Sequence, residues 1–169
     1  MNFKERIFEA DKKTLARLAN EMIVEPSVMI VDDNKELVDI DRDLFQGEGY
    51  NFYSAGDYEE LVRFLNNGLR TDIYILDADF PRKEKGKPEI MFPEAVHSIR
   101  GYHKLDGIWQ PAVAVRSGQD YGKIADELEV SFVGKGDKVL RNDLDIAEHY
   151  LAQFNKENDH ARDFVKRLS

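Results

Sequence analysis

The sequence contains no cysteine, which excludes disulfide bonds, thiolate metal sites and cysteine nucleophiles. It also lacks a run of about 18 apolar residues, so we expect no segment to span a membrane. The first residues, MNFKERIFEADKK, lack the apolar centre of a secretory signal peptide. These absences together predict a cytoplasmic protein.

Positive charge is scarce as well. The 169 residues include 24 Lys and Arg against 33 Asp and Glu, which gives a net charge of −9. Non-specific nucleic-acid binding needs a surplus of basic side chains, so we expect no direct binding to nucleic acid. The 42% of apolar residues can form a core, and the length suits one domain with an extra element or two.

The chain divides into three parts by pattern. Residues 1–25 show helical apolar spacing and predict an N-terminal helical extension, which Pro26 ends. Residues 26–154 form the main domain, in which short apolar runs alternate with amphipathic stretches. Residues 155–169 are a charged tail. The main domain predicts an α/β fold with a doubly wound, five-stranded parallel sheet, with strands at 28–31, 51–53, 73–76, 112–115 and 131–133.

Five helices are expected between and after these strands, at 35–46, 58–66, 93–103, 121–128 and from about Asn142 onward. In the first of them, Leu37, Ile40, Leu44 and Phe45 are predicted to face inward. Residues 80–92 form a polar loop that is longer than most connections of this kind.

Charged and hydroxyl side chains follow four of the strands. Asp32 and Asp33 come after the first, Asp77 after the third, Ser117 after the fourth and Lys135 after the fifth. The carboxyl ends of parallel strands meet at one edge of the sheet, so these side chains should lie close together.

Clustered carboxylates repel one another unless a cation separates them, and Mg²⁺ prefers such oxygen ligands. A central carboxylate can attack a phosphoryl group to form an acyl phosphate, whose charge a metal and a lysine would offset. Taken singly, each residue has a simpler interpretation: the acids as helix caps, Ser117 as a turn residue, Lys135 as a solvated loop residue.

The same stretches resemble the receiver domain of bacterial response regulators, over roughly Pro26 to Phe154. VMIVDDN is similar to the first strand and acid pair of that family, and DIYILDADFP to the third strand with its phosphoacceptor. GEGYNFYSAGDYEELVRFL, AVRSG and SFVGK are similar to the second strand and helix, the fourth strand with its hydroxyl residue and the fifth strand with its lysine. The resemblance implies the flavodoxin-like receiver fold.

The resemblance also implies a role for each matching residue. Asp32, Asp33 and Asp77 would hold Mg²⁺ together with the backbone carbonyl of Asp79. Asp77 would accept the phosphoryl group from a histidine kinase or a histidine phosphotransfer protein. Ser117 and Lys135 would contact the phosphoryl group. Ser117 and the aromatic residue Phe132 would form the switch and move together. Phosphorylation would then change protein–protein contacts. The resemblance implies no enzymatic activity beyond self-phosphorylation and autodephosphorylation.

Alternatives remain open at this point. Gly136 stands where the family usually has proline, which leaves room for a pseudo-receiver that binds partners without phosphotransfer. A haloacid-dehalogenase-type phosphatase also uses an Asp-x-Asp motif, but its motif strand comes first and its acid pair last, the reverse of the order here. The output protein is unknown, and a homodimer through the N-terminal helix is a hypothesis.

Overall fold

The computed structural model describes residues 26–79, 90–106 and 110–134, together with helical positions 144–145, 147–148 and 152. The predicted N-terminal extension, the charged tail and residues 80–89 of the long loop lie outside this part of the chain.

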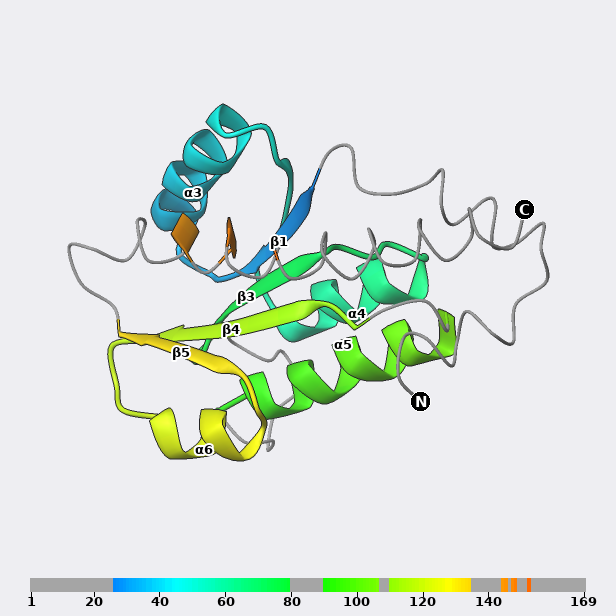
Figure 1. The fold of residues 1–169 in the computed structure, drawn as a ribbon, viewed down its shortest axis with the longest axis vertical. Helices are drawn as coiled ribbons and strands as arrows, with labels where there is room; N and C mark the ends of the chain where they lie inside the picture. Colours follow the sequence, from blue (N-terminus) through cyan, green and yellow to red (C-terminus); the bar gives the residue numbers. More distant parts are fainter. Residues whose placement is uncertain are drawn as a thin grey trace.

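The centre of the domain is a five-stranded parallel sheet with the order β2-β1-β3-β4-β5 (Figure 1). Its strands match the predicted runs to within a few residues. The order places β1 and β3 side by side. The chain crosses from β1 to β2 in one direction along the sheet, and from β3 to β4 and β5 in the opposite direction. This change of direction confirms the predicted doubly wound sheet. The strands are β1 (Ser27–Val31), β2 (Asn51–Ala55), β3 (Ile73–Asp77), β4 (Ala112–Ser117) and β5 (Ser131–Gly134).

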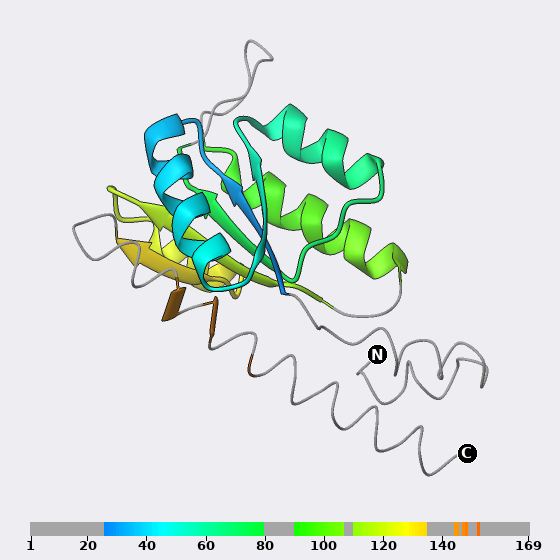
Figure 2. The same cartoon turned by 90° about the horizontal axis from the view of Figure 1, so that it is seen from above.

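Helices cover both faces of the sheet. In Figure 2, α3 lies on one face, and α4 and α5 lie on the other. The contacts of the core agree with this view, because one buried cluster joins the sheet to α4, α5 and α6 and a second joins it to α3. The helices with described bounds are α3 (Lys35–Gly47), α4 (Tyr58–Asn66), α5 (Phe92–Asp106) and α6 (Gly122–Glu127).

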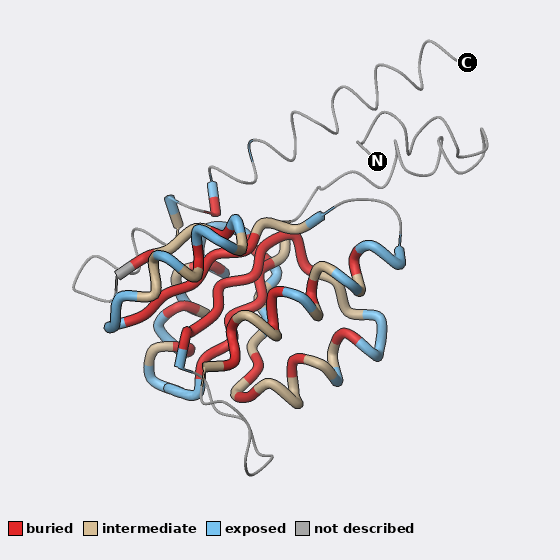
Figure 3. Tube along the Cα trace, turned by 90° about the horizontal axis from the view of Figure 1, so that it is seen from below, coloured by how far each residue is buried: buried red, intermediate tan, exposed pale blue. Residues whose placement is uncertain are grey.

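The strands supply both cores by alternation. In β3, Tyr74 and Leu76 belong to the cluster under α4, α5 and α6, whereas Ile73 and Ile75 belong to the cluster under α3. Successive side chains of a strand point to opposite faces, and β3 is buried along its whole length. The central strands accordingly form a buried layer in Figure 3. Ala147, in the region of the predicted fifth helix, packs on the α3 side.

Local sequence signals explain where the helices begin and end. The side chain of Asn34 accepts hydrogen bonds from the backbone N–H groups of Glu36 and Leu37 and caps α3, and Asp57 caps α4 in the same way. Gly49 and Gly68 follow α3 and α4 with φ of 86° and 87°, a left-handed conformation that glycine adopts without steric cost.

The inward face of α3 differs from the prediction at one position. Ile40 is 46% exposed, whereas its neighbour Asp41 is fully buried. The buried residues of α3 are Val38, Asp41 and Phe45, so the prediction that Ile40 faces inward was wrong. The reason is the buried guanidinium of Arg116 on β4, which forms an ion pair with Asp41.

Candidate functional site

Three carboxylates meet at the carboxyl edge of the sheet, as the sequence predicted. Asp32 directly follows β1 and Asp77 ends β3, and the two strands pair in register up to Val31 and Leu76. Asp33 is the next residue along the chain. One carboxylate oxygen from each of the three acids lies within 4.8 Å of the others.

The environment of the three acids is uneven. Asp32 and Asp77 are each only 3% exposed, whereas Asp33 is exposed. Burial makes the mutual repulsion of the carboxylates costly, because the local dielectric is lower than that of water. An all-oxygen donor set with an exposed side suits a hard divalent cation such as Mg²⁺, which keeps several of its water ligands. The donor chemistry therefore fits a Mg²⁺ site.

Asp32 is held in one orientation by contacts to both of its carboxylate oxygens. Oδ1 accepts a hydrogen bond from the backbone N–H of Asn34 at 2.8 Å, and Oδ2 accepts one from Nη2 of Arg116 at 2.9 Å. The backbone N–H of Asp32 also donates to the carbonyl of Ala55 at 3.0 Å. The position of this carboxylate is thus fixed by both main chain and side chain.

Arg116 is the buried charge that the sequence analysis missed. It lies in β4 between Val115 and Ser117 and is fully buried. Its other terminal nitrogen, Nη1, lies 2.8 Å from Oδ2 of Asp41 on α3. Alternation along β4 places Arg116 on the α3 side of the sheet, together with Ala112 and Ala114. The guanidinium therefore joins the first strand, the fourth strand and the first helix of the described domain.

Asp41 is paired with Arg116 within the core, but the pairing does not fully offset its burial. Burial raises the pKa of this carboxyl, and the neighbouring Arg116 acts in the opposite direction. An arginine in an otherwise apolar central strand was a visible signal of such a network. A buried arginine requires a paired anion, and Asp41 occupies the inward face of the adjacent helix.

The predicted hydroxyl residue also lies at this edge. Ser117 ends β4 and is 1% exposed. Its Oγ donates to Oδ2 of Asp79 at 3.2 Å and accepts a hydrogen bond from the backbone N–H of Gln119 at 3.0 Å. The hydroxyl of Tyr121 lies 3.0 Å from both Oδ1 of Asp79 and Oε1 of Gln119. The Asp79 side chain therefore links Ser117 to the start of α6.

Of the remaining predicted site residues, the structure describes Phe132 but not Lys135. Phe132 lies in β5, is half-buried and packs against the core cluster under α4, α5 and α6. Lys135 and Gly136 lie outside the described residues. The structure thus brings together Asp32, Asp33, Asp77, Asp79 and Ser117 at one edge.

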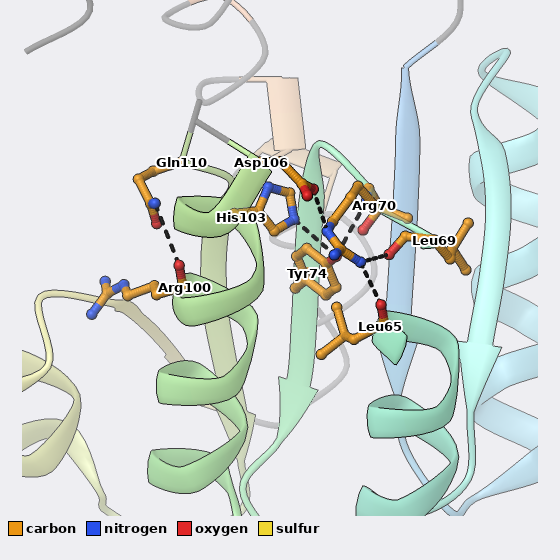
Figure 4. Close-up of polar contacts among 9 residues, drawn as sticks. Leu65, Leu69, Arg70, Tyr74, Arg100, His103, Asp106 and Gln110 are labelled. Carbon is orange, nitrogen blue, oxygen red and sulfur yellow. Dashed lines mark hydrogen bonds and ion pairs between the residues drawn. The ribbon is translucent and has the colours of Figure 1, made fainter. Parts of the chain in front are cut away.

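The opposite, amino edge of the sheet carries a second polar cluster (Figure 4). The hydroxyl of Tyr74 accepts a hydrogen bond from the backbone N–H of Thr71 at 3.2 Å and lies 3.0 Å from Nε2 of the buried His103. Arg70 forms an ion pair with Asp106 at 2.6 Å. Burial is the main cause that raises the pKa of Tyr74. This cluster pairs α5 with the start of β3 and contains no group of like charges.

No protein-family model matches the sequence, and no curated protein matches it. Solved structures do match. A response regulator receiver domain protein from Methanospirillum hungatei superposes with a TM-score of 0.61 at 18% identity, covering 79% of this chain and 98% of that one. A response regulator receiver protein from Sinorhizobium medicae gives 0.62 at 12% identity, covering 78% and 98%. The chemotaxis response regulator CheY4 of Vibrio cholerae gives 0.57 at 18% identity, covering 72% and 98%.

These similarities identify the fold class as a flavodoxin-like α/β fold with the strand order 2-1-3-4-5. More particularly, the chain has the fold of a CheY-like receiver domain, and its Asp32, Asp33 and Asp77 form an acidic cluster that resembles the phosphorylation site of such domains. Among the described residues, no helix is long and apolar enough to cross a membrane.

Proposed function

We propose that the protein is a two-component response regulator whose receiver domain, residues 26–154, is phosphorylated on Asp77 in a Mg²⁺-dependent reaction. The observation that carries the proposal is the cluster of Asp32, Asp33 and Asp77 at the carboxyl edge of the sheet. Asp77 ends the central strand β3, where a rigid backbone positions its carboxylate. The phosphodonor would be a histidine kinase or a histidine phosphotransfer protein.

The group transfer assigns a simple task to Asp77. One of its carboxylate oxygens forms a bond to phosphorus as the bond between phosphorus and the donor imidazole nitrogen breaks. That nitrogen keeps the electron pair and takes up a proton from water. Bound Mg²⁺ would offset the negative charge of the phosphoryl oxygens. The ion would be held by Asp32, Asp33, Asp77 and the backbone carbonyl of Asp79.

Ser117 and Lys135 would contact the new phosphoryl group. The Ser117 hydroxyl now donates to Asp79, so it must exchange that acceptor for a phosphoryl oxygen. We propose that this exchange, with a rearrangement of Phe132 on β5, shifts the domain between two packings and alters its contacts with partner proteins. The protein would act by this switch and not by turnover of a separate substrate.

Beryllofluoride binding tests the acceptor, since this anion stands in for a phosphoryl group on a carboxylate. We expect beryllofluoride with Mg²⁺ to raise the melting temperature of the wild type and to leave Asp77→Asn unchanged. Asp72→Asn is the matched control, because the same chemical change then lies at the amino edge, where Asp72 accepts hydrogen bonds from Ser27. This variant should respond as the wild type does.

The other outcomes separate the alternatives. No response from the wild type would contradict phosphotransfer and favour the pseudo-receiver, whereas a full response from Asp77→Asn would place the acceptor on another residue. Hydrolysis of a phosphate ester that depends on Asp77 would favour the phosphatase. We expect no such hydrolysis.

A further inference from the structure

A fully buried arginine on a central strand of a parallel sheet needs an explanation. The other residues of β4 before Ser117 are alanine and valine, as expected for a strand covered on both faces. The side chains of Arg116, Asp32 and Asp41 are each at most 1% exposed in their ion pairs. Burying three charges carries a large desolvation cost, and apolar residues of similar volume often stabilise a core as well or better. Stability alone therefore does not account for this network.

The geometry connects the network to the acidic cluster. Arg116 donates from one terminal nitrogen to Asp32, and its other terminal nitrogen pairs with Asp41. Asp41 thus keeps the guanidinium in place from the side of α3. The backbone N–H of Asn34 occupies the second oxygen of Asp32. Both carboxylate oxygens of Asp32 are thus held by hydrogen bonds, one from the main chain and one from Arg116.

We propose that Arg116 is a positioning residue for the metal site: it orients Asp32, and Asp41 holds Arg116, so that the acidic cluster is arranged before the cation binds. The inference rests on the proposed function, because it takes the cluster as a Mg²⁺ site. Groups that hydrogen-bond to metal ligands from behind typically contribute about 10–100-fold to metal affinity. Arg116 and Asp41 contribute opposite charges, so the pair can do this without a net charge of its own.

The test compares Mg²⁺ affinity, measured by calorimetry, in the wild type and in the double variant Arg116→Met with Asp41→Leu. This change removes one positive and one negative charge together, so the net charge stays the same and the loss of orientation is isolated. We expect Mg²⁺ binding to weaken by about tenfold or more, while circular dichroism shows an intact fold. If this variant does not fold, the polar pair Arg116→Gln with Asp41→Asn replaces it.

Two further variants complete the design. Tyr74→Phe, at the amino edge, is the control for a core change distant from the metal, and it should bind Mg²⁺ as the wild type does. Arg116→Lys keeps the charge but loses the two-pronged contact, so its affinity should lie between those of the wild type and the double variant. If Mg²⁺ affinity simply fell with any weakening of the core, Tyr74→Phe would also bind Mg²⁺ more weakly. The affinities would then not decrease in the order wild type, Arg116→Lys, double variant.

The outcomes distinguish the inference from the function on which it rests. If the double variant binds Mg²⁺ as tightly as the wild type, or more tightly, while Asp33→Asn binds it weakly, the positioning role is overturned and the metal site stands. If the wild type itself binds no Mg²⁺, both are overturned.

Discussion

At the amino edge of the sheet, polar side chains meet partners of complementary charge or hydrogen-bonding character. Tyr74 contacts Thr71 and His103, and Arg70 pairs with Asp106. At the carboxyl edge, by contrast, three carboxylates lie within 4.8 Å of one another. The polar groups of the cluster at the amino edge thus pair with one another, whereas the cluster at the carboxyl edge of the same sheet consists of like charges. The second arrangement is costly unless cations offset the charges, which supports the proposed metal site at this edge.

Arg116 modifies this contrast, because it brings a buried ion pair to the carboxyl edge. Its guanidinium is shared between Asp32, which belongs to the acidic cluster, and Asp41, which belongs to the core. The carboxyl edge therefore combines a cluster of three carboxylates with a buried cation that contacts one of them. Variants at the two edges should separate these contributions.

The largest effect is expected from Arg116→Ala. Removing the guanidinium leaves two buried carboxylates without their cation, which should lower the free energy of unfolding by about 3–5 kcal/mol. Urea unfolding followed by circular dichroism measures the loss. The double replacement by Met and Leu should lose clearly less, since it removes Asp41 as well. Equal losses in the two variants would show that the ion pair is not what Arg116 contributes.

A smaller loss is expected from Tyr74→Phe at the amino edge. The hydroxyl accepts the hydrogen bond of the buried Thr71 N–H and contacts His103, and removing it should cost about 1–3 kcal/mol of stability. Beryllofluoride and Mg²⁺ responses should not change. If they did, the two edges would be coupled and the contrast between them would fail.

The smallest effect concerns pH. Burial raises the pKa of Asp72 above its ordinary value of 3.8, with the hydrogen bonds from Ser27 acting in the opposite direction. The folded state therefore holds this proton more tightly than the unfolded state does. The stability that this group contributes is present below pH 3.8 and is lost as pH rises through the raised value.

Asp72→Asn removes this titration and keeps an oxygen for Ser27. The stability of the variant relative to wild type should therefore rise as pH increases from about 4, by less than about 1.4 kcal/mol per pH unit. Unfolding at a series of pH values measures the difference. A difference that falls over this range would show that the folded state favours the charged carboxylate.

Much of the fold could be predicted because its signals are local. Alternating apolar runs and amphipathic stretches indicated the strands and the order of the helices in the described part of the chain. The rule that strand ends meet at one edge brought Asp32, Asp77 and Ser117 together. The ion pair from Arg116 to Asp32 spans 84 positions. The arginine in an apolar strand signals a buried anion, but no local pattern identifies Asp32 as its partner. The wrong prediction for Ile40 has the same cause. Its hydrophobicity predicts burial, but Arg116, which is distant in the sequence, pairs with Asp41, and Asp41 is buried instead.

The most direct test of the account is phosphorylation itself. Wild type and Asp77→Asn would be incubated with a small-molecule phosphodonor such as acetyl phosphate, with and without Mg²⁺. Intact mass would report the added group, and borohydride reduction of the acyl phosphate would locate it. We expect a single phosphoryl group on Asp77 that requires Mg²⁺ and is missing from Asp77→Asn. An unmodified wild type, or the same modification in Asp77→Asn, would contradict it.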